Sequence, residues 1–372
     1  MHSNWDTVIG QSRVKRIVHT ALRQQRVAHA YLFWGNEGVG ADAVAIEFAR
    51  TLLCESGTES ACGICPSCKK IEMLQHPDLK LIFPLPGGEG EKNEDGESVE
   101  TDVMEEIRRQ TAEKAKNPYS RIEIPKAKFI RIKSIREIKR ESSMSSTEMG
   151  KKVFLIFDAD AMNDAAANSL LKILEEPLEH VHFILTTSRK DQLKQTIISR
   201  CQLIHCGRLT DDEIAGALIQ RENVEKQQAL FVSRLAGGSY LRAMQLLNED
   251  LNRYRTDAVS FLRSVLGPSP LRFFDEQEEY MTGNKRNEAE NMLMMLLVFF
   301  RDALIVREQT STVFNIDQSA DLDSFVGKFG HRQLEQCLTA VERSLELLRR
   351  NVYLPLIMLS VLVHIRSILD AK

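Results

Sequence analysis

The sequence predicts an α/β domain built around a mainly parallel sheet, followed by a region that is helical throughout. Strand-like apolar runs alternate with helical patterns up to residue 206 of the 372 residues, which is the order of elements from which parallel sheets are built. From Leu209 onward the apolar residues recur with helical spacing only. The strand-like runs are residues 31–34, 79–83, 153–157, 181–187 and 202–206.

The composition is that of a globular chain with no overall attraction to nucleic acid. Apolar residues make up 43% and charged residues 27% of the sequence, and the net charge is −3, so a contact with nucleic acid needs a local basic patch. The first residues include no basic stretch followed by an apolar one, and we expect a cytoplasmic protein without a signal peptide. The longest apolar runs, residues 292–300 and 352–365, are too short or too interrupted to span a bilayer, and we expect buried helices there.

A glycine-rich turn, GNEGVGADAVA beginning at Gly35, follows the first strand and precedes a helical pattern. Gly35 and Gly40, with Gly38 between them, give it the frame of a phosphate-binding loop, whose backbone N–H groups cradle phosphates. Such a loop also needs a Lys that neutralises the phosphates and a Ser or Thr that binds Mg²⁺, and this chain has Ala41 and Asp42 there. These two residues argue against ATP hydrolysis and leave open a glycine turn that binds no ligand.

The acidic half of a nucleotide site is also incomplete. An ATPase of this type ends a neighbouring strand with Asp-Glu, of which the first holds Mg²⁺ through water and the second activates the attacking water. This chain has VFLIFDADAMN, beginning at Val153, which puts Phe157 at the metal position and Asp158 at the base position. Shifting the alignment by one residue puts Asp158 on the metal and loses the base. Because each half lacks a catalytic group, we interpret the region as a nucleotide-binding scaffold from which the chemistry has been lost.

Four of the seven cysteines crowd into residues 54–68, namely Cys54, Cys62, Cys65 and Cys68. Four thiolates at this spacing complete a tetrahedral Zn²⁺ site, and the turns of CGICPSC allow neighbouring sulfurs to face one ion. Redox chemistry at a CxxC pair and free thiols are the alternatives, and neither accounts for four cysteines together. We therefore predict a structural zinc module.

An acidic insertion and a basic helix follow the second strand-like run. Residues 87–117 are glycine-rich at first and then acidic, and we interpret them as a solvated insertion with one short helix. The sign of the charge then reverses, and Ser134 with Glu137 forms a capping box that predicts the start of a basic helix. Its cations suit contacts with DNA phosphates and suit a solvated helix face equally well. The candidate DNA-contacting residues are Lys133, Arg136, Lys139 and Arg140.

Two further stretches contain charged residues whose positions suggest a function, one at a helix end and one just before the last strand. NDAAANSLLKILEEP predicts a helix that is capped by Asn163 and ended by Pro177. Glu175 lies at its C-terminal end, where the helix dipole disfavours negative charge, so we expect a basic side chain nearby. TIISRCQ contains Arg200 just before the last strand. An exposed Arg there can stabilise phosphate charge on a neighbouring subunit, as an arginine finger does, although a single surface Arg is more often only solvated.

Taken in order, HAYLFWGNEGVG, the four-cysteine array, NDAAANSLLKILEEP, FILTTS and TIISRCQ closely resemble the bacterial clamp-loader subunits of DNA polymerase III, within the AAA+ family. The resemblance covers residues 5–250, and beyond them only the helical character is similar. In that family the gamma/tau subunits carry an intact Lys-Thr loop and Asp-Glu pair, whereas the delta-prime subunits often do not. Ala41, Asp42 and the incomplete acidic pair make this chain resemble the delta-prime branch.

The resemblance implies roles for several residues. It implies that Arg200, within Ser199-Arg200-Cys201, projects into the ATP site of an adjacent gamma/tau subunit, and that the four cysteines bind a structural zinc. Thr187 matches a sensor position on the fourth strand, and Arg242 lies near a second sensor. Since no ATP is expected to bind, we expect these two residues, Asp158 and the loop glycines to be vestigial.

The family architecture implies an AAA+ α/β domain at residues 1–206 that carries the zinc module (54–68) and the acidic insertion (87–117), then a helical lid at 207–255 and a helical collar at 256–372. By resemblance, the collar assembles five subunits, gamma/tau and delta among them, into a ring that loads the sliding clamp on primer-template DNA. We expect a subunit of the DNA polymerase III holoenzyme with no activity of its own. The alternatives are a gamma/tau-like ATPase that is active alone and a zinc-containing DNA-binding module.

Overall fold

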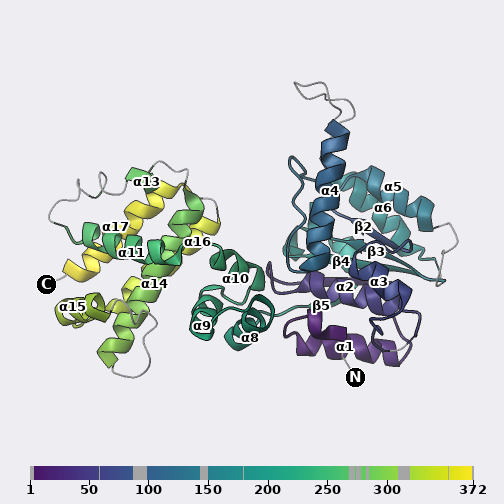
Figure 1. Cartoon of the computed structure of the whole chain (residues 1–372). Coiled ribbons are helices and arrows are strands. Elements are labelled where there is room, and N and C mark those ends of the chain that lie inside the picture. Colours follow the sequence, from purple (N-terminus) through teal and green to yellow (C-terminus); the bar gives the residue numbers. More distant parts are fainter. Residues whose placement is uncertain are drawn as a thin grey trace. The chain divides into compact units, whose positions relative to one another are not determined.

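The computed structural model describes residues 4–57, 59–86, 99–142, 150–178, 180–267, 273, 278–281, 285–308, 319–350 and 352–370. The chain divides into two compact units, Met1–Gln245 and Leu246–Lys372 (Figure 1). The first unit contains a β-sheet with helices, and the described part of the second is helical. The predicted boundaries at residues 206 and 255 are not tested by this division and stay predictions.

The first unit is built around a five-stranded sheet with the strand order β2-β3-β4-β1-β5. Every neighbouring pair of strands is parallel, which confirms the predicted sheet. The register places Trp34, the last residue of β1, opposite Thr187, the last residue of β4, so the segments that follow these strands leave the same edge. The strands are β1 (Ala30–Trp34), β2 (Leu79–Ile82), β3 (Lys152–Ile156), β4 (Val181–Thr187) and β5 (Gln202–His205).

Helices cover both faces of the sheet because its strands are apolar on both sides. Tyr31 and Phe33 of β1 contact Phe48 of α2, with ring centroids 4.9 and 6.1 Å apart. Leu32 belongs to the opposite face, in a buried cluster with apolar residues of α5, α6 and α7. The helical elements of this α/β part are η1 (Asn4–Thr7), α1 (Ser12–Arg23), α2 (Ala41–Leu52), α3 (Pro66–Glu72), α4 (Val99–Lys116), α5 (Ile132–Ser142), η2 (Ala159–Ala161), α6 (Asp164–Glu175), η3 (Lys190–Gln192) and α7 (Gln195–Ile198).

Helix α4 corrects two details of the predicted insertion: its helix is long, and two residues towards its C-terminal end are buried, whereas its other described residues stay partly or fully exposed. The helix spans 18 residues, and the side chain of Lys114 near its end is only 1% exposed. The prediction failed because a charged residue with a fixed partner can be buried without any apolar pattern in the sequence. The first part of the insertion, residues 87–98, lies outside the described residues.

Three short helices follow the sheet: α8 (Asp211–Glu222), α9 (Lys226–Leu235) and α10 (Tyr240–Leu247), the last of which crosses the boundary between the units. Helix α8 begins with a capping box: the backbone N–H of Glu213 donates to the Thr210 hydroxyl, and the backbone N–H of Thr210 donates to the Glu213 carboxylate. Helices α8 and α9 pack against each other as a hairpin. The backbone N–H of Tyr240 at the start of α10 donates to the carbonyl of Gly38 at 2.9 Å, which ties α10 to the glycine loop.

The described part of the second unit is a helical bundle organised around α14, which packs against α11, α15 and α16. Phe299 and Phe300 of α14 contact Phe325 of α15, with ring centroids 5.4 and 5.9 Å apart. Among the described residues, no helix is long and apolar enough to cross a membrane. The helices are α11 (Leu251–Val265), α13 (Glu278–Met281), α14 (Arg286–Glu308), α15 (Ser319–Phe329), α16 (Leu334–Arg349) and α17 (Leu354–Asp370).

Candidate functional site

The glycine-rich turn joins the end of β1 to the start of α2, as the sequence predicts. Gly38 and Gly40 have φ angles of 75° and 104°, in the left-handed region that favours glycine. A Cβ on Gly38 would lie 2.1 Å from the Ser239 hydroxyl oxygen, and one on Gly40 would lie 3.0 Å from the Tyr119 ring. The loop is therefore enclosed by two segments that are distant in sequence.

A cavity of about 50 Å³ lies beside this loop. Both charged and apolar side chains line it. The walls come from the loop, the ends of β3 and β4, Leu241 of α10, and residues between Lys114 and Ile122. These last residues were not predicted at the site, because Lys114 lies in the stretch expected to be solvated and no local pattern marks the residues that follow it.

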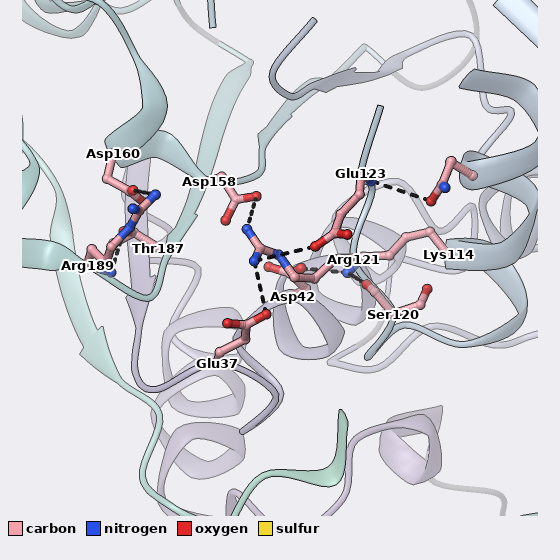
Figure 2. Close-up of polar contacts among 11 residues, drawn as sticks. Glu37, Asp42, Lys114, Ser120, Arg121, Glu123, Asp158, Asp160, Thr187 and Arg189 are labelled. Atoms are coloured by element: carbon pink, nitrogen blue, oxygen red, sulfur yellow. Dashed lines mark hydrogen bonds and ion pairs between the residues drawn. The ribbon is translucent and has the colours of Figure 1, made fainter. Parts of the chain in front are cut away.

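Lys114 brings a cation to the loop that lacks its own Lys. Its Nζ lies 2.5 Å from Oδ2 of Asp42 and donates to the carbonyl of Ser120, also at 2.5 Å (Figure 2). The same ammonium lies 5.0 Å from the centre of the Phe157 ring, within the range of a cation–π contact. A buried ammonium requires such partners, and here Asp42, in the first turn of α2, is the anionic one.

Arg121 brings a second cation, which pairs with three carboxylates. Its guanidinium lies 3.0 Å from Glu37, 3.3 Å from Asp158 and 3.6 Å from Glu123 (Figure 2). Burial raises the pKa of the Asp158 carboxyl, and the Arg121 charge opposes that shift. Asp158, the candidate for the acidic position, is thus held by a residue of its own chain.

Thr187, the candidate sensor, is also held by residues of this chain. Its hydroxyl donates to Oδ1 of Asp160 at 2.5 Å and accepts from the backbone N–H of Arg189 at 3.0 Å. The side chain of Asp160 is fully buried, and its Oδ2 lies 2.7 Å from the Arg189 guanidinium (Figure 2). Arg242, the second sensor candidate, donates to the Gln245 side chain at 3.5 Å, and its neighbour Leu241 is the α10 residue that lines the cavity.

Arg200 lies between α7 and β5, with a side chain that is 34% exposed. Its guanidinium lies 2.7 Å from the Glu175 carboxylate and donates to the carbonyl of Thr196 at 3.0 Å. This is the basic partner that we expected at the C-terminal end of α6. Ser199 donates its hydroxyl to the same Thr196 carbonyl. Burial raises the pKa of the Cys201 thiol to about 12, so this flanking cysteine is protonated at neutral pH.

The four predicted cysteines come together in one cluster. The Sγ atoms of Cys54, Cys62, Cys65 and Cys68 all lie within 4.8 Å of one another, a spacing compatible with four ligands on one ion. The backbone N–H of Cys62 donates to the sulfur of Cys54, and that of Cys68 donates to the sulfur of Cys65. Backbone N–H groups of Ile64 and Cys65 lower the pKa of Cys62 to about 6, whereas burial raises the pKa of Cys68 to about 12. The cluster could hold a metal ion.

The basic helix predicted near Ser134 is α5, which begins slightly earlier, at Ile132. Ile135 and Ile138 are buried against the sheet, while the four candidate DNA-contacting residues Lys133, Arg136, Lys139 and Arg140 are exposed. Exposure alone fits both interpretations of this helix, so the DNA contact stays a prediction.

Comparison with known proteins identifies the family. The family model described as DNA polymerase III, delta subunit, matches residues 10–210, which is more than half of the chain. The delta' subunit of DNA polymerase III from Bacillus subtilis is 29% identical over 80% of this chain and 78% of its own length. The delta' subunit from Pseudomonas aeruginosa is 29% identical over 66% of this chain and 64% of its own length.

Related subunits and solved structures are similar over other spans. The tau subunit from Escherichia coli is 28% identical over 70% of this chain, which spans only 35% of that relative's length. A solved DNA polymerase III gamma subunit-related protein from Thermotoga maritima has 15% identity and a TM-score of 0.39 over 94% of this chain and 99% of that chain. Taken with the family model, the sequence relatives confirm the predicted resemblance: the chain belongs to the DNA polymerase III delta subunit family and is a delta'-like clamp-loader subunit.

Proposed function

We propose that this chain is a non-hydrolysing scaffold of the clamp loader that supplies Arg200 to ATP bound on a neighbouring gamma/tau subunit. The observation that carries the proposal is the paired state of the pocket: Asp42 is matched by Lys114, and Asp158 by Arg121. Because these cations already pair with the carboxylates at the phosphate loop, the subunit in this proposal acts on ATP through a different surface, the one that carries Arg200.

The charges around the cavity disfavour ATP. Its lining includes three carboxylates, Glu37, Asp42 and Asp158, and two cations, Lys114 and Arg121. Two unit charges of like sign at about 4 Å repel by about 1 kcal/mol in water and by about 4 kcal/mol near a protein surface. A polyphosphate therefore meets an excess of negative charge, and entering would break two ion pairs.

Arg200 is suited to act across an interface. Its ion pair with Glu175 is partly exposed on both sides, at 34% and 44%, and pairs of this kind contribute about 0–1 kcal/mol. Exchanging that carboxylate for a phosphate on an adjacent subunit costs little, and the guanidinium fork matches phosphate oxygens. The Thr196 carbonyl and the Ser199 hydroxyl oxygen accept from Nη1 of the same guanidinium, at 3.0 and 3.4 Å.

The four-cysteine cluster supports a structural role for zinc. Cys54, Cys62, Cys65 and Cys68 would hold the ion, and its bonds would cross-link the segment between α2 and α3. Four thiolates leave no open coordination position, so the ion would supply folding energy and no catalysis.

The partners follow from the same proposal. Relatives named as delta' and tau subunits support assembly with gamma/tau and delta subunits, in a five-subunit ring that acts on the sliding clamp and primer-template DNA. In this proposal residues 207–255 form the lid, residues 256–372 form the collar, and the exposed cations of α5 face DNA phosphates.

The test is an ATPase assay on the loader reconstituted from gamma/tau, delta and this chain. Arg200→Ala is expected to slow hydrolysis at the adjacent ATP site by about 10³-fold or more, as loss of an arginine finger does. Arg200→Lys keeps the charge without the fork and should lose most of the rate. Glu175→Gln is the matched control, because it breaks the same ion pair but keeps the guanidinium. A fully active Arg200→Ala loader, or ATP hydrolysis by the isolated chain, would refute the proposal.

A further inference from the structure

We infer that residues 114–123, called the plug segment, occupy the degenerate pocket as an internal ligand in place of a nucleotide. In that position the segment contacts three parts of the fold: the residues just after η1, the phosphate loop and α10. It keeps these three parts together when no ATP is bound. The inference rests on the proposed function only in taking the pocket to be free of nucleotide. It gives the end of the acidic insertion, where α4 leads into the plug segment, a role within the fold.

Tyr119 provides the first line of evidence. Its hydroxyl oxygen accepts from the backbone N–H of Ile9 at 2.7 Å, a buried hydrogen bond between residues 110 positions apart. Its ring stands against Gly40, where an added Cβ would come within 3.0 Å, and makes an edge contact with the Tyr240 ring at a centroid distance of 5.0 Å. One side chain therefore contacts the N-terminal segment, the phosphate loop and α10.

The cations of the plug segment provide the second line of evidence. Lys114 is 1% exposed and pairs with Asp42 at the start of α2, while Arg121 pairs with Glu37 in the loop and with Asp158 after β3. A nucleotide presents an anion to a cationic loop, whereas here the segment presents cations to an acidic loop. The inverted charge of the loop and the cations of the segment thus complement each other.

The contacts continue from the pocket into the small helices. Tyr240, whose ring meets Tyr119, donates its hydroxyl to Glu222 of α8 at 3.2 Å and its backbone N–H to the Gly38 carbonyl. Ile9, Tyr119, Tyr240 and Glu222 therefore form a continuous series of contacts from the N-terminal segment to α8. Removing the Tyr119 side chain should therefore increase local unfolding both at Ile9 and in α10. If Tyr119 only packed against one neighbour, the effect would be confined to that neighbour.

Hydrogen–deuterium exchange on the full chain tests this coupling. Tyr119→Phe keeps the ring but removes the acceptor, so the Ile9 amide should exchange about fivefold faster, as expected for one lost hydrogen bond, while α10 stays protected. Tyr119→Ala should speed exchange at Ile9 and across α10 together. Tyr353→Ala, at a tyrosine of the other unit that is 63% exposed, is the control. Unchanged exchange at Ile9 and α10 in Tyr119→Ala would overturn the inference.

Calorimetric titration with Mg²⁺-ATP tests whether the segment excludes nucleotide. Ala41→Lys with Asp42→Thr restores the loop, and adding Lys114→Ala, Tyr119→Ala and Arg121→Ala clears the pocket. We expect at least tenfold tighter ATP binding after clearing than with the restored loop alone. Equal affinity in the two variants, or no binding in either, would count against the inference. Neither of these two results bears on the proposed function, which is tested by whether the loader with the unmodified chain depends on Arg200. The inference and the proposed function can therefore be refuted independently.

Discussion

Replacing Lys114 with Met removes a buried charge while keeping most of the side chain's length. The lost contacts are the ion pair with Asp42 and the hydrogen bond to the Ser120 carbonyl, both at 2.5 Å. Removing one partner of a buried pair costs about 3–5 kcal/mol, because the other charge stays behind unpaired. Asp42 is 31% exposed and lies at a helix N-terminus, where the dipole favours it, so we expect a smaller loss of about 2–3 kcal/mol.

Thermal denaturation of the full chain measures this loss. A loss of this size corresponds to a Tm decrease of roughly 5 °C for a unit of this length. Lys116→Met removes an exposed Lys from the same helix and should leave Tm nearly unchanged. Adding Asp42→Leu to Lys114→Met removes the stranded carboxylate and should restore part of the stability, because the two sites are in contact.

The double variant decides between an ion pair and simple packing. If Lys114→Met lowers Tm no more than Lys116→Met does, the buried contact with Asp42 does not stabilise the fold. If the effects of Lys114→Met and Asp42→Leu add, the two residues are uncoupled and the pocket is not electrostatically matched. Either result would refute the reasoning from charge complementarity.

Two further predictions concern the buried Glu47 and the four-cysteine cluster, both in the first unit. Burial raises the pKa of Glu47 from its ordinary value of 4.5 to about 7, so the folded state binds the proton more tightly and stability falls as pH rises from about 4.5 to about 7. Glu47→Gln should therefore stabilise the chain at pH 8, by at most about 3 kcal/mol, but not at pH 4, and equal Tm differences at both pH values would contradict this. Cys65→Ser keeps an oxygen that can cap α3 in place of the Cys65 sulfur, so loss of bound zinc in elemental analysis, together with a lower Tm, would report on the metal site. Cys201→Ala should retain the zinc, and full zinc content in Cys65→Ser would exclude a four-cysteine site.

The parts of the fold that sequence analysis predicts correctly are those encoded by neighbouring residues. The apolar runs that become β1 to β5 and the Asn163 cap of α6 are local signals, and a parallel sheet follows from their alternation with helices. The four cysteines converge because the turns between them are short. The basic partner of Glu175 was also predictable in kind, because the helix dipole requires one, although nothing local selects Arg200 among the available cations.

The parts that sequence analysis misses depend on contacts between distant segments. Lys114 and Asp42 are 72 positions apart, and Tyr119 and Ile9 are 110 positions apart. An acidic, glycine-rich composition predicts solvation, and it hides the few residues at the end of the insertion that are buried. A usable signal was present: Asp42 adds a carboxylate next to Ala41, in a loop without a Lys of its own, and an uncompensated charge there requires a basic partner elsewhere in the chain.

The missing Lys of the phosphate loop and the presence of Lys114 are therefore two parts of one arrangement. A Lys at position 41 would place a second ammonium beside the buried one of Lys114, and the repulsion would favour displacement of the plug segment. Conversely, Asp42 without Lys114 would leave a carboxylate next to Asp158, whose carboxyl already has a raised pKa through burial. The Asp42 carboxylate and the Lys114 ammonium are each unfavourable at this site without the other. The acidic charge that Asp42 brings to the loop is tolerated in this fold because Lys114, near the end of the insertion, supplies the opposite charge from within the same chain.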